Sequence, residues 1–245
     1  MKIELEILQF LHFHPLSNRA EISMGISDAP SDSTMKRLIA SAVKKGQVEV
    51  VGKGPSVRYK LTPQALVTMP LDLSTYFNKD IDEREAQESF NFELIQDLLP
   101  HVELFTTEEL DILENAQKQF LFNIAEMTAL EYRKEMERLG VDLSWKSSQI
   151  EDIHAILTKE LGVDRNIRHR RVGITGTNYR PLDNEFQIRE ALEDTCTLVN
   201  SKRNVFEKAL LVLVLLSYIQ AFTDGNKRTA RITSKITSRL SSKFS

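Results

Sequence analysis

The first third of the chain carries two helical patterns of apolar residues. Apolar side chains three and four positions apart make one helix face, at Ile3, Ile7, Leu8 and Leu11. A short second helix is predicted between Asn18 and Gly25. Both helices need partners, because each has only one apolar face. The pattern therefore predicts a small helical domain that begins near the N-terminus.

Residues 31–47 have the features of a third helix. Ser31 or Ser33 can cap its start, and Gly46 can end it after two lysines. The side chains expected to point inward are Leu38, Ile39 and Ala42. Residues 48–61 then alternate between apolar and polar positions on both sides of the turn Gly-Lys-Gly-Pro at 52–55, which predicts two strands joined as a hairpin.

The middle of the chain is predicted to be a connection followed by helices. Residues 62 to about 80 contain two prolines and short apolar pieces, which indicates a link between domains. From Ile81 to Leu143 the pattern is helical. One helix is expected to stop at Pro100, and another to start at Thr106 or Thr107 with an acidic first turn.

A buried helix is expected to end in a polar turn. The longest apolar run, around residues 209–216, predicts a core helix that is too short to cross a membrane. The apolar pattern stops after Ile219, where Thr-Asp-Gly-Asn has the composition of a turn. A new helix is expected to begin near Asn226. Its apolar residues recur every four positions as a narrow buried stripe, at Ile232, Ile236, Leu240 and Phe244.

Composition narrows the classes of protein. The 245 residues suggest one to two domains, and a hydrophobic content of 41% allows a sizeable core. The net charge of −3 argues against a polyanion binder as a whole. A single cysteine excludes an internal disulfide and, in a chain without a signal-peptide pattern, predicts a cytoplasmic protein with no membrane contact. The five histidines show no ligand spacing with the cysteine, so no zinc site is expected.

The stretch QAFTDGNKRTAR, residues 220–231, has the chemistry of an anion site. It leads into a helix N-terminus, where backbone N–H groups lack acceptors. Arg228 and Arg231 lie three residues apart and therefore share a helix face. Cations at this end of a helix are unfavourable unless an anion is bound, which points to phosphate. Asp224, beside the phosphates, would suit a magnesium ion.

This stretch resembles the signature of the Fic family, His-x-Phe-x-[Asp/Glu]-Gly-Asn-Gly-Arg-x-x-Arg. The matching positions are Phe222, Asp224, Gly225, Asn226, Arg228 and Arg231. Upstream, IHAILTKELG and RVGITGTNYRPLD resemble the family's helix and its substrate-positioning flap, so the likeness spans about residues 150–231. The resemblance implies a mainly α protein, whose Fic domain is all-helical apart from a small β-hairpin flap above the site.

Fic proteins transfer a phosphate-containing part of a nucleotide, usually AMP from ATP, to a hydroxyl side chain of a protein. The resemblance thus implies ATP and Mg²⁺ as cofactors, and a target protein or the chain itself as acceptor. In this scheme Asp224 holds magnesium, and Asn226 with the following backbone holds the α-phosphate. The flap that positions the target comprises Thr175, Gly176, Thr177 and Tyr179.

The same resemblance assigns the remaining residues of the signature. Arg228 would hold the β-phosphate and Arg231 the γ-phosphate, with Gly225 and Lys227 completing the nucleotide site. Phe222 would anchor the loop in the core. The implied activity is that of a protein adenylyltransferase.

Two residues depart from the signature. Gln220 stands where the family has its histidine, the general base, and loss of general-base help typically costs about a hundred- to ten-thousand-fold in rate. This substitution predicts a weak transferase or a pseudoenzyme, while a purely structural Gln220 that closes the loop is the alternative.

Lys227 replaces the second glycine, as in the Doc branch, which transfers the terminal phosphate. A phosphotransferase is therefore a further alternative.

WKSSQIED, residues 145–152, resembles the family's inhibitory motif [Ser/Thr]-x-x-x-Glu-[Gly/Asn], with Ser147 and Glu151 at the matching positions. In that scheme the glutamate pairs with the second arginine of the signature, here Arg231. The alternative is a surface helix with a solvated Glu151. In relatives further helices separate this motif from the Ile-His helix, whereas here Glu151 nearly adjoins His154, for which a structural role is expected.

The N-terminal segment is more basic than the rest. Residues 1–65 hold nine Lys/Arg and six Asp/Glu, a net charge of +3 that leaves −6 for the remainder. Three helices and a basic hairpin resemble a winged helix-turn-helix, whose third helix enters the major groove of DNA. The residues expected at DNA phosphates are Lys36, Arg37, Lys44, Lys45, Lys53 and Arg58. A dimerisation or docking module is the alternative.

The expected organisation is therefore a winged helix at 1–66, a helical connection with the first part of the Fic region at 67–146, and the Fic core at 147–245. The competing function is that of a DNA-binding regulator whose Fic domain only senses nucleotide. A homodimer is left open.

Overall fold

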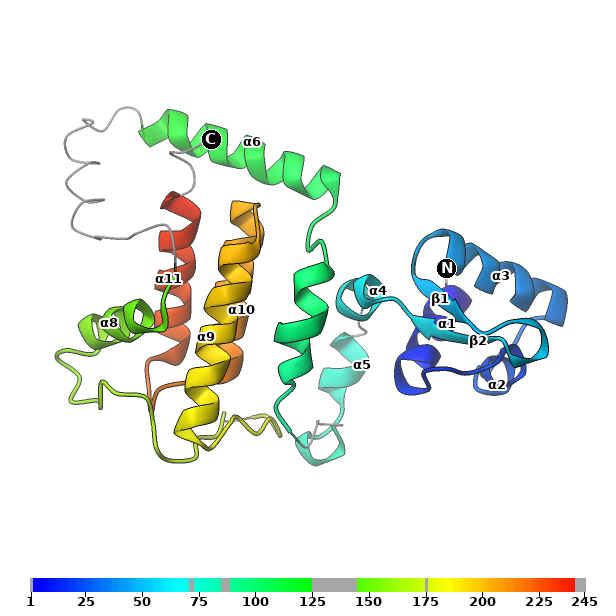
Figure 1. Ribbon diagram of the computed structural model, residues 1–245, viewed down its shortest axis with the longest axis horizontal. Coiled ribbons are helices and arrows are strands. Elements are labelled where there is room, and N and C mark those ends of the chain that lie inside the picture. The colour runs from blue at the N-terminus through cyan, green and yellow to red at the C-terminus, as the bar shows by residue number, and fades with distance from the viewer. Residues whose placement is uncertain (1, 71–72, 85–88, 125–144, 175, 241–245) are drawn as a thin grey trace. The chain divides into compact units, whose positions relative to one another are not determined.

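The chain folds as two compact units, Met1–Asn78 and Lys79–Ser245, which are predominantly helical (Figure 1). The computed structural model describes residues 2–70, 73–84, 89–124, 145–174 and 176–240. Within these residues, no helix combines the length and the apolar character needed to cross a membrane.

The first unit consists of helices around one hairpin. Its elements are α1 (Lys2–Phe13), α2 (Arg19–Met24), α3 (Asp32–Lys44), β1 (Val48–Val51), β2 (Arg58–Leu61), α4 (Pro63–Thr68) and α5 (Leu73–Asn78). The strands pair antiparallel, with Val48 opposite Leu61, and a short 3₁₀ turn at Gly54–Ser56 lies between them. The three predicted helices and the hairpin are thus confirmed as elements. Their assignment as a winged helix-turn-helix stays a prediction.

The core of the first unit is formed by the apolar faces that the sequence pattern predicts. Ile7, Leu8 and Leu11 of α1 are buried against Ile39 and Ala42 of α3 in a single cluster. The six-residue helix α2 begins where it does because of a reciprocal cap. The Asn18 side chain accepts from the backbone N–H of Glu21, and the Glu21 carboxylate accepts from the backbone N–H of Asn18.

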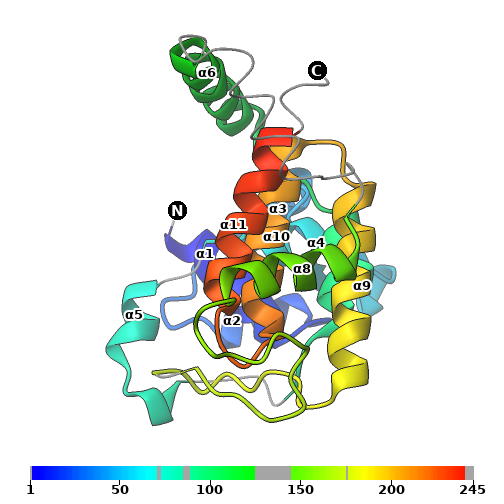
Figure 2. The same ribbon diagram turned by 90° about the vertical axis from the view of Figure 1, so that its left-hand side faces the viewer.

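The second unit is mainly helical and contains the pocket described below. After a 3₁₀ turn (Ile81–Glu83) and a π segment (Leu94–Leu98) that continues into another 3₁₀ turn (Leu99–His101) come α6 (Thr107–Ile124), α8 (Ser147–Leu157), α9 (Glu185–Ser201), α10 (Val205–Ile219) and α11 (Asn226–Leu240). Helix α10 packs against both α9 and α11, and α8 lies across α9 and α11 (Figures 1 and 2).

One helix end in the second unit differs slightly from the prediction. The π segment ends at Leu98, and Pro100 lies in the first turn of the 3₁₀ segment that follows, where its missing N–H is not required. The segment therefore runs on to His101 before it becomes extended. Residues 85–88 and 125–143 of the predicted helical stretch lie outside the described residues.

The buried face of α11 also differs from the predicted stripe. Ile236 is buried, but Ile232 is 36% exposed, and the side chains of Leu240 and Phe244 lie outside the described residues. The positions that face the core are instead Thr229, Ala230, Thr233, Ile236 and Thr237. A repeat of four residues drifts around a helix of 3.6 residues per turn, so the apolar stripe leaves the core and threonines take its place.

Candidate functional site

A surface pocket of about 440 Å³ lies where α10 gives way to α11. The loop of residues 220–225 and the first turns of α11 form one wall, and residues 172–174 form another. The lining residues are Val172, Gly173, Ile174, Gln220, Thr223, Asp224, Gly225, Asn226, Lys227, Arg228 and Arg231. Thus the candidate catalytic, metal and nucleotide residues of the 220–231 stretch border a single pocket.

Gln220 is the residue at which α10 ends. Its φ of 53° and ψ of 54° are left-handed, a conformation that suits a helix C-terminus but is uncommon in residues other than glycine. The side chain is buried, and its Nε2 donates to the carbonyl oxygen of Ser217 at 2.5 Å. The Gln220 amide therefore caps the helix from which it projects, while the residue also borders the pocket.

The loop turns its carbonyl groups toward the protein. The carbonyls of Gln220, Ala221 and Phe222 accept from Arg168 Nε (2.6 Å), the Arg168 backbone N–H (3.1 Å) and Asn226 Nδ2 (2.6 Å), respectively. Those of Asp224 and Gly225 accept from His154 Nε2 (2.9 Å) and the Thr229 backbone N–H (2.9 Å). All of these donors belong to buried residues. Between Gln220 and Gly225, only the Thr223 carbonyl has no donor in the described part of the chain.

The start of α11 presents backbone N–H groups to the pocket, whereas most of the loop carbonyls are bonded within the protein. Asn226, Lys227 and Arg228 form its first turn, where backbone N–H groups have no acceptor within the helix. No other acceptor for these three N–H groups is present among the residues that the structure describes. The aligned peptide dipoles of α11 add partial positive charge at the same place. This combination makes the pocket wall suited to an anion.

Three cationic side chains strengthen that character. Lys227, Arg228 and Arg231 are all exposed, and none forms an ion pair with a carboxylate in the described ranges. Asp224 is the one acidic residue that lines the pocket. Its Oδ1 accepts from the backbone N–H of Gly225 at 2.6 Å, so Oδ2 has no partner from the loop.

The structure places the Asn226 side chain differently from the expected contact with the α-phosphate. Its Oδ1 accepts from the backbone N–H of Phe222 at 2.8 Å, and its Nδ2 donates to the Phe222 carbonyl at 2.6 Å. Both polar atoms therefore close the loop, and the residue is 8% exposed. What Asn226 offers to the pocket is its backbone N–H.

Arg168 is a residue of the site that the sequence pattern did not single out. Its side chain is 2% exposed, and its guanidinium donates to the carbonyls of Gln220, Arg170 and Leu182. Within the described residues, no carboxylate is bonded to it. Burial lowers the pKa of Arg168, while the fields of Tyr179 and Asp183 raise it. Arg168 joins the segment before α9 to the end of α10, and so connects the two walls of the pocket.

His154 of α8 also supports the loop and does not line the pocket. Its ring is fully buried and is stacked on the ring of Phe222, with 3.7 Å between centroids and 3° between planes. Phe222 itself is 2% exposed. One contact, the stack of the two rings, therefore accounts for the structural role expected for His154 and for the anchoring role expected for Phe222.

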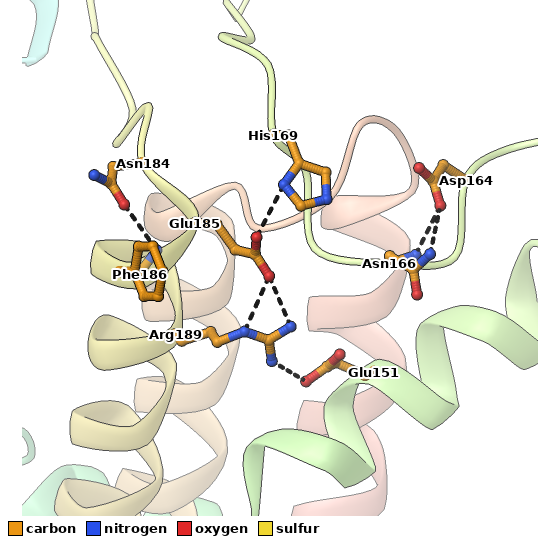
Figure 3. A network of polar contacts seen from close by, with 8 residues as sticks. All are labelled: Glu151, Asp164, Asn166, His169, Asn184, Glu185, Phe186 and Arg189. Atoms are coloured by element: carbon orange, nitrogen blue, oxygen red, sulfur yellow. Dashed lines mark hydrogen bonds and ion pairs between the residues drawn. The ribbon is translucent and has the colours of Figure 1, made fainter.

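Glu151 forms a different ion pair from the one that the inhibitory scheme implies (Figure 3). Its Oε1 lies 3.4 Å from Nη1 of Arg189 in α9, and the same guanidinium is bonded to Glu185 at 2.9 Å. Glu185 in turn pairs with His169 at 2.9 Å. No pair between Glu151 and Arg231 is formed in the described part of the chain, because the carboxylate is directed to α9. Ser147 is the first residue of α8.

The predicted flap is an extended segment with a tight turn, and no strand is present in residues 171–174 and 176–184. The Thr177 backbone N–H donates to the carbonyl of Ile174 at 3.2 Å, and Gly176 has a φ of +81°. Tyr179 stacks on Tyr218 and donates to its carbonyl at 2.6 Å. Burial raises the pKa of the Tyr179 phenol above its ordinary value. Thr175 lies outside the described residues.

Fold and site together define a helical domain with a pocket that is suited to an anion and lies at the junction of the packed helices α10 and α11. Residues 144–236, which include α8, the flap segment and the whole pocket, match the family model described as the Fic/DOC family. This match supports a Fic domain in that part of the chain and suggests a Fic-type function for it. Residues 1–143 lie outside the match. A comparison with curated proteins finds no match.

Proposed function

We propose that the pocket at residues 220–231 binds the phosphates of ATP as part of a Fic domain that transfers AMP weakly or not at all. The observation that carries the proposal is the polarity of the loop. Its carbonyls, except that of Thr223, are bonded to buried donors, while the N–H groups of the first turn of α11 and three cations that form no ion pair in the described residues remain at the pocket. An anion with several oxygen atoms fits this arrangement.

The residues present also fit a magnesium ion bound with the nucleotide. Asp224 offers the kind of oxygen that magnesium prefers, and it is the one carboxylate among the residues that line the pocket. Magnesium would neutralise charge on the phosphates when bound. In the proposed arrangement the backbone of Asn226 and Lys227 meets the α-phosphate, and Arg228 and Arg231 meet the β- and γ-phosphates. The flap segment would position the acceptor hydroxyl.

The proposed weakness follows from Gln220. Its amide cannot take a proton from an acceptor hydroxyl, and it is already bonded to the end of α10. The other titratable groups at the pocket are Asp224 and three cations, so no histidine replaces the missing base in the lining. Lys227 lines the pocket as well, and transfer of the terminal phosphate is the alternative that it favours.

Replacing Arg228 by alanine is expected to weaken the binding of ATP with magnesium about ten- to a hundredfold, the usual contribution of a hydrogen bond to a charged group. Titration calorimetry measures the change. Arg165→Ala removes another exposed arginine, one that does not line the pocket, and its binding should match the wild type. A wild-type protein that fails to bind ATP at millimolar concentration would contradict the phosphate site.

A second candidate function, DNA binding by the first unit, is favoured by the exposed cations of α3 and the hairpin. Lys36, Arg37 and Lys44 of α3 and Lys53 of the hairpin turn are exposed and form no ion pair in the described part of the chain. Lys45 is exposed as well, but it is paired with Glu4 at 3.1 Å. Arg58 is partly buried.

If these four cations contact DNA phosphates, the affinity should fall about a hundredfold between 50 and 200 mM salt, as release of about four counterions requires. Fluorescence anisotropy with a labelled duplex measures this slope. The double change Lys36→Gln with Arg37→Gln should reduce the slope by about two. Lys60→Gln is the control, because Lys60 is already paired with Glu49. Affinity that does not respond to salt would favour a docking module instead.

A further inference from the structure

The geometry points to His154 as a positioning residue of the pocket loop. We propose that its Nε2–H holds the carbonyl of Asp224, and thereby fixes both the Asp224 carboxylate and the first N–H groups of α11. The expected effect of His154 on nucleotide binding rests on the proposed function of the pocket as an ATP site. Its effect on the loop itself can be tested without a nucleotide.

The bond is buried and its direction is determined. His154 is fully buried, and its Nε2 lies 2.9 Å from the carbonyl oxygen of Asp224. A carbonyl oxygen can only accept, so the hydrogen must be on Nε2. Nδ1 has no partner within the described residues. The Nε2–H bond to Asp224 is therefore the one hydrogen bond that the ring makes in the described part of the chain.

The ring also restricts the loop by shape. It is stacked on Phe222, and it lies close to Gly225, where a Cβ atom would be 3.3 Å from Nε2. Gly225 has a φ of +82°, which glycine adopts without strain. Thr158, whose hydroxyl donates to the His154 carbonyl, would be 3.2 Å from the same Cβ. The turn at Asp224 and Gly225 therefore has little freedom to move toward α8.

Two consequences reach the pocket. The Asp224 carbonyl and carboxylate belong to one residue, so holding the first limits where the second can point. The peptide that follows leads directly into the first turn of α11, whose N–H groups border the pocket. A ring of similar size without a donor would fill the same space but would leave the Asp224 carbonyl without its bond. Both consequences therefore depend on the Nε2–H donor.

Two variants separate the donor from the ring. His154→Phe keeps an aromatic ring for the stack on Phe222 and removes the hydrogen-bond donor. His154→Gln keeps an N–H donor at similar reach and removes the ring. His101→Phe is the control, because His101 is exposed and remote in sequence from the loop. Amide hydrogen exchange of residues 223–228 is measured without nucleotide, and ATP binding is measured by calorimetry.

We expect His154→Phe to speed exchange in residues 223–228 by about three- to tenfold, the range for one lost hydrogen bond, and to weaken ATP binding by a similar factor. His154→Gln should stay closer to the wild type in both measurements. Loop exchange in His154→Phe equal to that of the wild type and the His101→Phe control would overturn the proposal. A wild type that binds no ATP removes the proposed function, while the exchange experiment still decides the role of His154.

Nitrogen NMR of the wild-type imidazole covers the case in which His154→Phe fails to fold. The proposal requires a slowly exchanging imidazole N–H signal that is assigned to Nε2 of His154. A hydrogen on Nδ1 instead, or no protected imidazole N–H, would overturn it.

Discussion

Replacing Arg168 by methionine is expected to lower the free energy of unfolding of the second unit by about 2–4 kcal/mol. The carbonyls of Gln220, Arg170 and Leu182 would lose their donor, and each buried acceptor left alone costs about 1–3 kcal/mol. Part of that cost is offset, because a buried cation that is expensive to desolvate is also removed. Loss of ATP binding should accompany the loss of stability, since Arg168 joins the two walls of the pocket.

Urea unfolding followed by the fluorescence of Trp145 is the appropriate measurement. This tryptophan is the only one in the sequence, and it is buried in the second unit. Arg171→Met is the matched control, three residues away, because Arg171 is largely exposed and pairs with Asp183 at the surface. Such a pair contributes about 1 kcal/mol or less. Equal destabilisation by the two changes would show that the three carbonyl bonds of Arg168 matter little.

Replacing Gln220 by histidine is expected to raise AMP transfer by about a hundred- to ten-thousandfold, the usual effect of a general base. The backbone allows the change, because histidine is among the residues enriched in the left-handed conformation that Gln220 adopts. The protein incubated with ATP labelled at the α-phosphate, and separately at the γ-phosphate, shows which group is transferred. Label from the γ-phosphate alone would support the phosphotransferase that Lys227 favours.

Gln220→Leu is the control for this experiment, since it changes the same position without adding a base and should remain silent. Adding Glu151→Gly to Gln220→His tests the inhibitory motif. Glu151 is paired with Arg189, so the double variant is expected to exceed Gln220→His only slightly. A much larger gain in the double variant would show that Glu151 reaches Arg231 when nucleotide is bound. Strong labelling by the wild type would contradict a weak enzyme.

Local patterns predicted the elements well, because the residues that determine them are close in sequence. Helix α3 spans Asp32–Lys44, within the predicted 31–47, with Ser31 at its N-cap position but without a side-chain capping bond. Helix α11 begins at Asn226 as expected. The resemblance to the Fic signature likewise identified the loop that lines the pocket, and the family match at 144–236 supports that domain.

Contacts between distant segments could not be predicted in the same way. Arg168 lies in the basic run Arg-His-Arg-Arg, and nothing local shows that this arginine is buried, because its partners are backbone carbonyls of Gln220 and Leu182. Glu151 could be matched to a motif, but its choice of Arg189 depends on how α8 packs on α9. The threonine face of α11 was missed since threonine carries a weak apolar signal in any periodicity.

The inward carbonyls of the loop also limit how a metal could bind. Octahedral magnesium needs six oxygen ligands. Among the backbone carbonyls between Gln220 and Gly225, only that of Thr223 has no donor in the described residues. The one carboxylate at the pocket is that of Asp224, and its Oδ1 already accepts from the backbone N–H of Gly225. Most ligands would therefore have to be phosphate oxygens and water. The ion would enter and leave as the partner of its nucleotide, and the empty pocket would have little affinity for magnesium alone.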